Sequence, residues 1–420
     1  MHYFGIPNYG VREISKIRKD KEKLSTIFKE LFLINFVSTT IIALLYYLVI
    51  TVLNINNKLL YYIEGIILIL NIFNVDWFYQ GMEEFKYITI RSAFIKILSI
   101  IAIFLFIKTK SHIYLYALIF AFAYVGNYTL NIINLRKYIN FSNVKVNKKK
   151  HLKSIFILAV TYISNEIYVT VDTLMLGVMN GDYQVGLYSN AMKLIKILIN
   201  LLTAIGVALL PRISFLKSKN EEEKLKKIIN KTIHILFFIT VPSVIGIIFI
   251  SKELIVVLFG EKFVNAQYIL IALALLIVLR TFSNLFLQML ISSHKDKNTS
   301  KVYFYGMVMN VILNYFMIKK YFAVGAAISS VIAEGYIMIM LMVSAKKDFK
   351  FELKKRIILS IVISSIMMLI PMCIVYSLNL KMIIKLGLSI MLGIVTYIVS
   401  NILMKNEIIF EGIKLLKRRK

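Results

Sequence analysis

Long blocks of apolar residues, separated by short charged connections, dominate the chain. We find about twelve blocks, each close to the roughly 20 residues that a helix needs to cross the hydrocarbon core of a bilayer. Because irregular backbone cannot face lipid, each block is expected to be helical, and the pattern predicts an all-α integral membrane protein. The blocks lie near residues 28–53, 59–78, 89–106, 113–133, 154–178, 186–210, 232–250, 264–291, 302–318, 323–344, 357–376 and 383–404.

The connections between the blocks form two sets that alternate along the chain. One set is rich in Lys and Arg and comprises 12–29, 86–91, 136–153, 212–231, 295–301, 346–356 and 405–420. The other set is short and much less basic and comprises 54–58, 107–112, 179–185, 251–263, 319–322 and 377–382. Basic connections stay in the cytoplasm, so the first set, including Arg91 and the C-terminus, is expected to be cytoplasmic.

Composition agrees with this class and narrows the function. Of the 420 residues 59% are hydrophobic and 17% charged, and the formal net charge is +29. The positive charge lies between the apolar blocks, where it meets anionic lipid, and nucleic acid is not an expected partner. Cys373 is the only cysteine and the five histidines are scattered, so neither a disulfide within the chain, a metal site nor a cofactor is expected. The less basic connections are too short for a catalytic domain, which favours a transporter over an enzyme.

Polar residues inside the blocks recur at spacings of three and four, which places them on one face of a helix. A charge at the centre of a span costs about 2.5–3.5 kcal/mol, so such residues should face the bundle interior or a water-filled cavity. The stripes are Thr161, Asn165, Tyr168 and Asp172 with Glu166 beside them; Ser189, Lys193, Lys196, Asn200 and Thr203; Tyr124, Asn127, Asn131 and Asn134; and Arg280, Asn284 and Gln288. Asp76, Lys96 and Glu334 are isolated candidates.

These stripes predict a hydrated, partly cationic cavity. Lys193, Lys196 and Arg280 are candidates to hold a pyrophosphate or acidic sugars through charge-assisted hydrogen bonds. The Asn, Ser, Thr and Tyr side chains are suited to sugar hydroxyls. Asp172 and Glu166 are candidate proton or sodium sites.

Simpler interpretations compete for several of these residues. The stripe at Tyr124–Asn134 is equally explained as polar contacts between helices. Lys193 and Lys96 can extend to a membrane boundary. For Asp172 an ion pair within the bundle competes with a transport role, and Trp77, near a boundary, is expected to anchor the helix at the interface.

Five segments give the chain a family resemblance. They are Gly5–Ile14, Asp76–Phe85, Val171–Gly177, Val185–Ala191 and Leu210–Arg212. With them the chain resembles, over essentially its whole length, the bacterial polysaccharide flippases for O-antigen, capsule and exopolysaccharide repeat units. These belong to the superfamily that also holds the multidrug and toxic compound extruders and the peptidoglycan lipid flippase.

The resemblance implies two pseudo-symmetric six-helix bundles facing a central cavity, two further C-terminal helices, and alternating access. On this mapping, residues 1–135 form the N-terminal bundle, 136–153 a basic cytoplasmic linker, 154–345 the C-terminal bundle, and 346–420 two further helices and a basic tail. Arg12 and the stripes of the fifth, sixth and eighth blocks would point at the lumen. Members of the family have about two helices before the Gly5–Ile14 segment, so the N-terminal bundle is expected to be truncated here.

The resulting expectation is a flippase of the cytoplasmic membrane for undecaprenyl-pyrophosphate-linked oligosaccharide. Lipid-linked oligosaccharide and anionic lipids are the expected partners, and the polysaccharide polymerase and chain-length machinery are further candidates. Two alternatives stay open: a cation-coupled multidrug exporter of the same superfamily and a membrane glycosyltransferase or polymerase.

Overall fold

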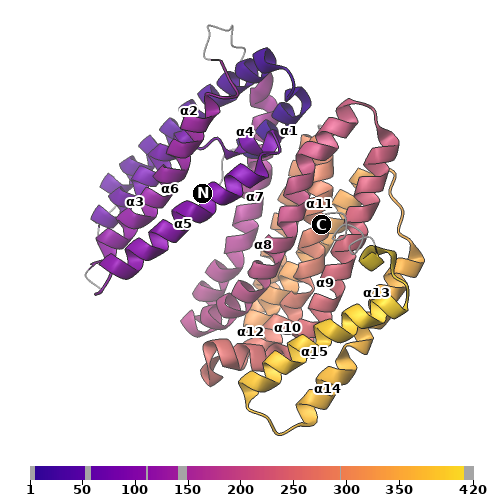
Figure 1. The fold of residues 1–420 in the computed structure, drawn as a ribbon. Helices are drawn as coiled ribbons and strands as arrows, with labels where there is room; N and C mark the ends of the chain where they lie inside the picture. The colour runs from indigo at the N-terminus through magenta and orange to yellow at the C-terminus, as the bar shows by residue number, and fades with distance from the viewer. Residues whose placement is uncertain (1–4, 53–57, 110–111, 141–148, 294, 411–420) are drawn as a thin grey trace. The chain divides into compact units, whose positions relative to one another are not determined.

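The computed structural model describes residues 5–52, 58–109, 112–140, 149–293 and 295–410, and within these ranges all regular structure is helical. The chain divides into two compact units (Figure 1). Unit 1 comprises residues 1–162 and 210–218, and unit 2 comprises residues 163–209 and 219–420.

Unit 1 contains α1 (Ile6–Ile17), α2 (Lys21–Val52), α3 (Lys58–Leu70), the short 3-10 helix η1 (Asn71–Phe73), α4 (Asp76–Gly81), α5 (Phe85–Phe106) and α6 (Ile113–Leu135). The first part of α7 (Lys149–Asn180) and the last turns of α8 (Asp182–Ser218) also belong to it. Helix α3 packs between α2 and α6, α5 packs on α6, and α1 packs on α4 and α2.

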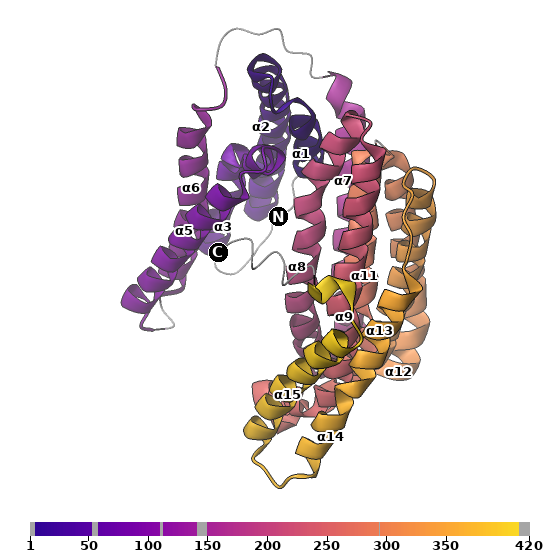
Figure 2. The same cartoon turned by 45° about the vertical axis from the view of Figure 1, so that its right-hand side comes forward.

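Unit 2 contains the remainder of α7 and α8, then α9 (Glu222–Phe259), η3 (Glu261–Phe263), α10 (Ala266–Ala274), α11 (Leu276–Ser292), α12 (Asp296–Lys346), α13 (Lys355–Met367), α14 (Leu369–Ser377) and α15 (Met382–Leu403). Its main core lies between α8, α9, α10, α11 and α12. A smaller core joins α9 to the last helices through Ile250, Met368, Met372, Leu386 and Tyr397. Helices α13 and α15 therefore lie against α9 (Figure 2).

Ten helical stretches of the described residues are long and apolar enough to cross a membrane. They cover eleven of the expected spans, because α12 contains two of them on either side of a break at Phe322, where φ is 52° and ψ is −134°. The twelfth, 154–178, lies in α7, which is not among the ten. The expected span 59–78 is not one continuous helix, since α3 ends at Leu70 and η1 and α4 follow.

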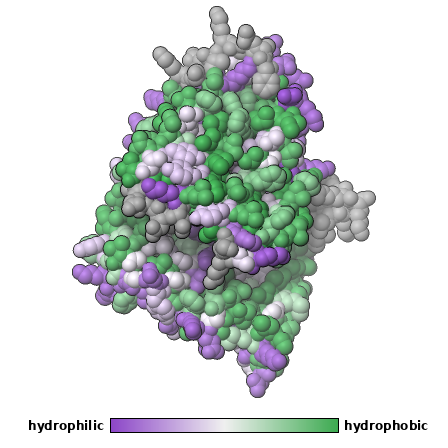
Figure 3. Space-filling view, turned by 90° about the vertical axis from the view of Figure 1, so that its left-hand side faces the viewer, coloured by the Kyte–Doolittle hydropathy of each residue, from purple (hydrophilic) through white to green (hydrophobic). Residues whose placement is uncertain are grey.

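The outward faces of these helices are apolar. Leu44, Phe104 and Leu403 each expose about two thirds or more of their surface. Only 17% of the most apolar 18-residue stretch of α5 is buried within the protein. Figure 3 shows apolar residues covering much of one face. Exposing these side chains to water would be unfavourable, whereas lipid tails would give them apolar surroundings. The chain is a multi-pass α-helical membrane protein.

Close packing of α1 on α4 depends on Gly10. A Cβ placed there would lie 2.4 Å from Cε3 of Trp77, well inside van der Waals contact. We expect Gly10→Ala to destabilise the protein by about 1–3 kcal/mol, the usual cost of overpacking, measured as the thermal stability of the detergent-solubilised protein. Gly335→Ala is the matched control, since its Cβ would meet nothing within 4 Å and helical Gly→Ala is otherwise favourable. Equal stability of the two variants would contradict this account of the contact.

Candidate functional site

Unit 2 contains a buried carboxylate between α7, α8 and α12. Asp172 on α7 is 2% exposed. Its Oδ2 accepts a hydrogen bond from the Tyr188 hydroxyl at 2.6 Å and one from the Ser330 hydroxyl, and its Oδ1 accepts one from Asn314 Nδ2 at 2.6 Å. Asn314 Nδ2 also donates to Asn310 Oδ1 at 3.3 Å. These hydrogen-bond partners are neutral, and within the described part of the chain Asp172 takes part in no ion pair, so the ion-pair interpretation is not what the structure shows.

The break in α12 brings two of these donors to one carboxylate. Asn314 lies before Phe322 and Ser330 lies after it, so the two halves of α12 both reach Asp172. Gly325 makes the close approach feasible, because a Cβ there would lie 2.1 Å from the Met317 carbonyl oxygen. The local sequence thus shapes the site through one left-handed residue and one glycine.

Lys196 links this carboxylate to a group of charged side chains. Lys196 on α8 is partly buried and interacts electrostatically with Arg280, Glu166 and Asp172. Arg280 on α11 donates through Nε to Glu334 Oε2 on α12 at 3.1 Å, and the Glu334 side chain is only 3% exposed. Four helices therefore contribute two cations and three carboxylates to one region of unit 2.

The stripe on α11 lies against α8 and α12. Besides Arg280, it contains half-buried Asn284 and buried Gln288. Asn284 Oδ1 and Gln288 Oε1 are buried and find no hydrogen-bond partner among the described residues. Buried acceptors of this kind are normally satisfied by water or a ligand.

The remaining predicted residues of unit 2 lie on more open surfaces. Lys193 and Asn200 on α8 are exposed, and Glu166 on α7 is exposed. The side chains of Asn165 and Tyr168 lie outside what the structure describes. Within the described residues no group of three or more His, Cys, Asp or Glu side chains is arranged to hold a metal ion.

Arg12 belongs to unit 1 and is fully buried there. Its guanidinium lies 4.9 Å from the Tyr9 ring centroid and its Nε contacts Glu13 Oε1 at 3.1 Å. The Tyr9 hydroxyl in turn meets His151 Nδ1 at 2.6 Å, and His151 Nε2 meets Glu30 Oε2 at 2.7 Å. Arg12 thus sits beside a buried polar relay that joins α1, α7 and α2.

An ion pair in unit 1 between buried Arg91 and partly exposed Asp76 corrects the expectation for Arg91. This residue was expected in a cytoplasmic connection, but it lies inside α5, is 5% exposed, and its Nη1 lies 3.0 Å from Asp76 Oδ1. Arg91 also donates to the amide oxygens of Asn127, at 3.0 Å, and Asn131, and Asn131 Nδ2 donates to Asp76 Oδ1 at 2.7 Å. The helix begins at Phe85, which carries Arg91 nearly two turns inward. Asn127 and Asn131 of the α6 stripe therefore make polar contacts with α4 and α5, which is the simpler of the two interpretations given above.

The expectation for Trp77 is also wrong. Its side chain is 3% exposed and stacks on Phe28, with ring centroids 5.6 Å apart and an interplanar angle of 21°. Packing within unit 1 holds this indole, so it does not anchor a helix at the membrane interface.

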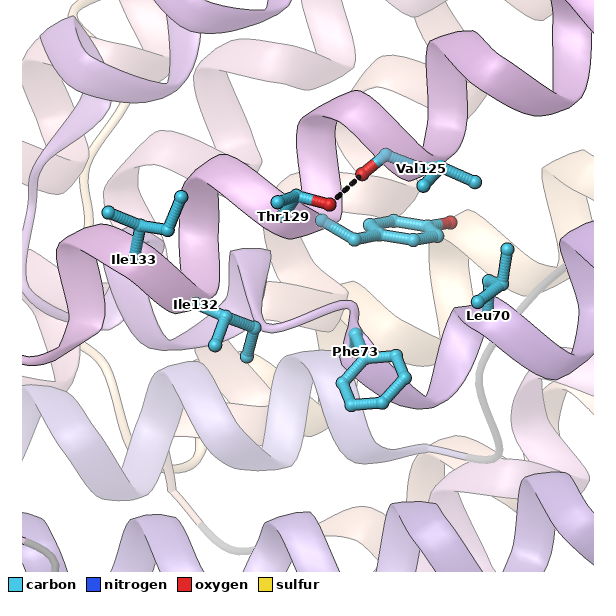
Figure 4. Close-up of a pocket in the computed structure, with 7 residues that line it drawn as sticks. Leu70, Phe73, Val125, Thr129, Ile132 and Ile133 are labelled. Atoms are coloured by element: carbon cyan, nitrogen blue, oxygen red, sulfur yellow. Dashed lines mark hydrogen bonds between the residues drawn. The ribbon is translucent and has the colours of Figure 1, made fainter.

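Two hollows lie between α6 and the α3–η1 segment, and the first is almost entirely apolar. One, of about 260 Å³, is lined by Leu70, Phe73, Val125, Tyr128, Thr129, Ile132 and Ile133 (Figure 4). The Thr129 hydroxyl donates a hydrogen bond to the Val125 carbonyl at 2.9 Å, so the wall of this hollow offers little polar surface to a ligand. The other, of about 760 Å³, adds Glu64 and Asn71 to a largely aromatic and aliphatic lining.

The residues that sequence reasoning missed are the partners of Asp172. Asn310 and Asn314 lie four apart in an expected span, a spacing that marks one helix face, and Ser330 lies in the next span. The same test that found the other stripes would have found the asparagine pair. Tyr188 lay within a family segment but on no polar stripe.

Comparisons with known proteins agree with this architecture. The sequence profile of the family described as polysaccharide biosynthesis protein matches residues 2–217, more than half of the chain, and the MatE profile matches residues 158–316. The capsular polysaccharide biosynthesis protein CapF of Staphylococcus aureus is 27% identical over 61% of this chain and 66% of its own length. A proposed O-antigen transporter of Shigella dysenteriae is 25% identical over 64% of this chain and 68% of its own length. A proposed low-salt glycan biosynthesis flippase of Haloferax volcanii is 26% identical over 41% of this chain, a match that spans only 37% of the relative.

Solved structures share the fold. The lipid II flippase MurJ in an inward closed conformation aligns over 97% of this chain and 94% of its own, with a TM-score of 0.60 and 18% identity. An outward-facing multidrug resistance transporter of the MATE family aligns over 82% of this chain and 83% of its own, with a TM-score of 0.64 and 14% identity. The chain thus has the helical transporter fold of this superfamily. Within it, the chain belongs to the polysaccharide biosynthesis protein family.

Proposed function

We propose that this protein is a flippase that moves undecaprenyl-pyrophosphate-linked oligosaccharide from the inner to the outer leaflet of the cytoplasmic membrane by alternating access. The observation that carries the proposal is the group of charges in unit 2 around Lys196 and Arg280, within a chain of the polysaccharide biosynthesis family. The relatives named for capsule, O-antigen and glycan export support the substrate class. The basic connections and C-terminus would lie on the cytoplasmic side.

In this mechanism the cations meet the pyrophosphate while the prenyl tail stays in lipid. Guanidinium and ammonium groups bind phosphate oxygens by charge-assisted hydrogen bonds, each contributing about 1.5–3 kcal/mol. Glu334 holds the guanidinium of Arg280 in place until an anionic ligand competes for it. Polymerase and chain-length proteins that act on the exported glycan would be partners of this step.

Asp172 is the proposed coupling site. The Asp172 carboxylate is held by three neutral donors and forms no ion pair with the described residues, so a proton or a sodium ion that neutralises it stabilises one arrangement of α7, α8 and α12 over another. Glu166, exposed on the same helix, is a second candidate for this role.

The test is flipping by purified protein in vesicles. Lipid-linked oligosaccharide is reconstituted with the protein, and the glycan that reaches the outside is followed with an added membrane-impermeant glycosidase. We expect flipping well above protein-free vesicles, and about tenfold slower flipping by Lys196→Gln, the loss for roughly 1.4 kcal/mol. Lys319→Gln, an exposed lysine on α12, is the matched control. A rate no higher than that of protein-free vesicles would sink the proposal.

A cation-coupled drug exporter is the second candidate, favoured by the MatE match and by buried Asp172. Overexpression in a drug-sensitive host separates the two. Raised resistance to cationic drugs, without any glycan flipping in vesicles, would favour the exporter.

A further inference from the structure

Two of the family segments meet at a small polar pocket in unit 1. The pocket encloses about 240 Å³ and is lined by Pro7, Asn8, Asn74, Asp76, Trp77, Gln80 and Tyr162. Its size lies below the roughly 300–1,000 Å³ of sites for drug-sized ligands, so it suits a single ring better than a whole repeat unit.

The carboxylate in this pocket is held in a fixed position. Asp76 Oδ1 takes both the ion pair with Arg91 and the hydrogen bond from Asn131. Its Oδ2 has no hydrogen-bond or ion-pair partner among the described residues, and the side chain is one third exposed. A carboxylate with one oxygen anchored and the other open is an acceptor ready for a hydroxyl.

Gln80 and Trp77 add unused donors. The Gln80 amide is partly exposed and makes no hydrogen bond within the described part of the chain. The Trp77 indole is buried, and its Nε1 likewise finds no acceptor among the described residues. A buried donor without a partner costs free energy, which a ligand oxygen would recover.

The chemistry of the lining selects the ligand. Among the described residues that line the pocket, Asp76 alone is ionised, and its carboxylate disfavours a phosphate or an acidic sugar. Amides and an indole N–H beside an open carboxylate oxygen match a neutral ring that carries several hydroxyl or amide groups. Apolar side chains make up most of the lining of the hollow in Figure 4, so an acyl or prenyl chain would be better accommodated there.

We propose that this pocket, the Trp77 pocket, is a subsite for one neutral sugar residue of the transported glycan. The inference rests on the proposed function for its ligand class. It assigns the neutral glycan to unit 1 and leaves the pyrophosphate to the cations of unit 2.

Trp77 itself provides the test, because it is the only tryptophan of the chain. The purified full-length protein is titrated with free N-acetylglucosamine, glucose and galactose, and the indole emission is recorded. We expect at least one of them to give a saturable shift or quench with half-saturation in the millimolar range, and about tenfold weaker binding by Gln80→Leu. Gln267→Leu, an equally half-buried glutamine on α10, should titrate like the parent.

Two outcomes would overturn the subsite: no saturable change with any of the three sugars, or a Gln80→Leu protein that elutes like the parent on gel filtration and titrates like it. Flipping in vesicles is measured separately. Flipping without an emission change removes the subsite and leaves the proposed function standing. An emission change without flipping supports the sugar site and removes the flippase.

Discussion

The Asp172→Asn protein is expected to fold and to lose at least tenfold of its flipping rate, together with its response to an imposed proton or sodium gradient. Asparagine keeps the shape of the side chain but removes the charge. Its oxygen can still accept from Asn314, while its amide faces the Tyr188 and Ser330 hydroxyls, which are able to accept as well as donate. The substitution therefore isolates the charge from the packing.

The expected loss of flipping rate follows from the coupling between ion binding and the conformational change. An ion drives a conformational change only through its different affinity for the two states, and tenfold corresponds to about 1.4 kcal/mol. Removing the carboxylate removes that difference. The initial flipping rate is measured in vesicles with and without a gradient of each ion.

Asp182→Asn is the control for this experiment. Asp182 begins α8 in the same unit and is exposed, so the same change of charge occurs away from the buried cluster. We expect parental flipping and gradient dependence. An Asp172→Asn protein that keeps both properties would show that the carboxylate is structural.

The helices of this protein follow directly from the length of its apolar blocks. Crossing lipid requires helix, so the blocks predict the elements without any tertiary information. The break in α12 was also visible, since Phe322 lies in the expected connection 319–322. The interruption between Leu70 and Asp76 was not, because apolar residues continue through it and only Asn71 and Asn74 hint at the change.

The sequence predicts on which face of its helix each polar residue of the site lies, but not which residue of another helix it contacts. Spacing placed Asp172, Lys196 and Arg280 on polar faces, and the structure brings Lys196 into electrostatic range of both Asp172 and Arg280. Which residue across the bundle meets each of them depends on how helices pack, which spacing within one helix does not encode. Arg91 shows a second limit of the sequence pattern. The charges around Arg91 are typical of a connection between spans, but the helix that contains it begins six residues earlier.

The Arg91→Leu protein is expected to lose about 3 kcal/mol of its free energy of unfolding, near the lower end for removing one partner of a buried ion pair. The lower end applies because the Asp76 side chain is one third exposed and water partly compensates it. The oxygens of Asn127 and Asn131 would also lose their donor. The measurement is the fraction of monodisperse, detergent-solubilised protein that survives heating.

Two further variants serve as controls for this prediction. Lys96→Leu removes an exposed cation from the same helix, where surface changes usually stay within about 0.5 kcal/mol. Arg91→Lys keeps the charge but not the planar fork that reaches both asparagines and Asp76, so it should fall between the two. If Arg91→Leu survived heating as well as Lys96→Leu, the network would not be what holds α4, α5 and α6 together. Because the network also fixes Asp76 in the Trp77 pocket, Arg91→Lys should weaken sugar binding there even where the protein stays folded.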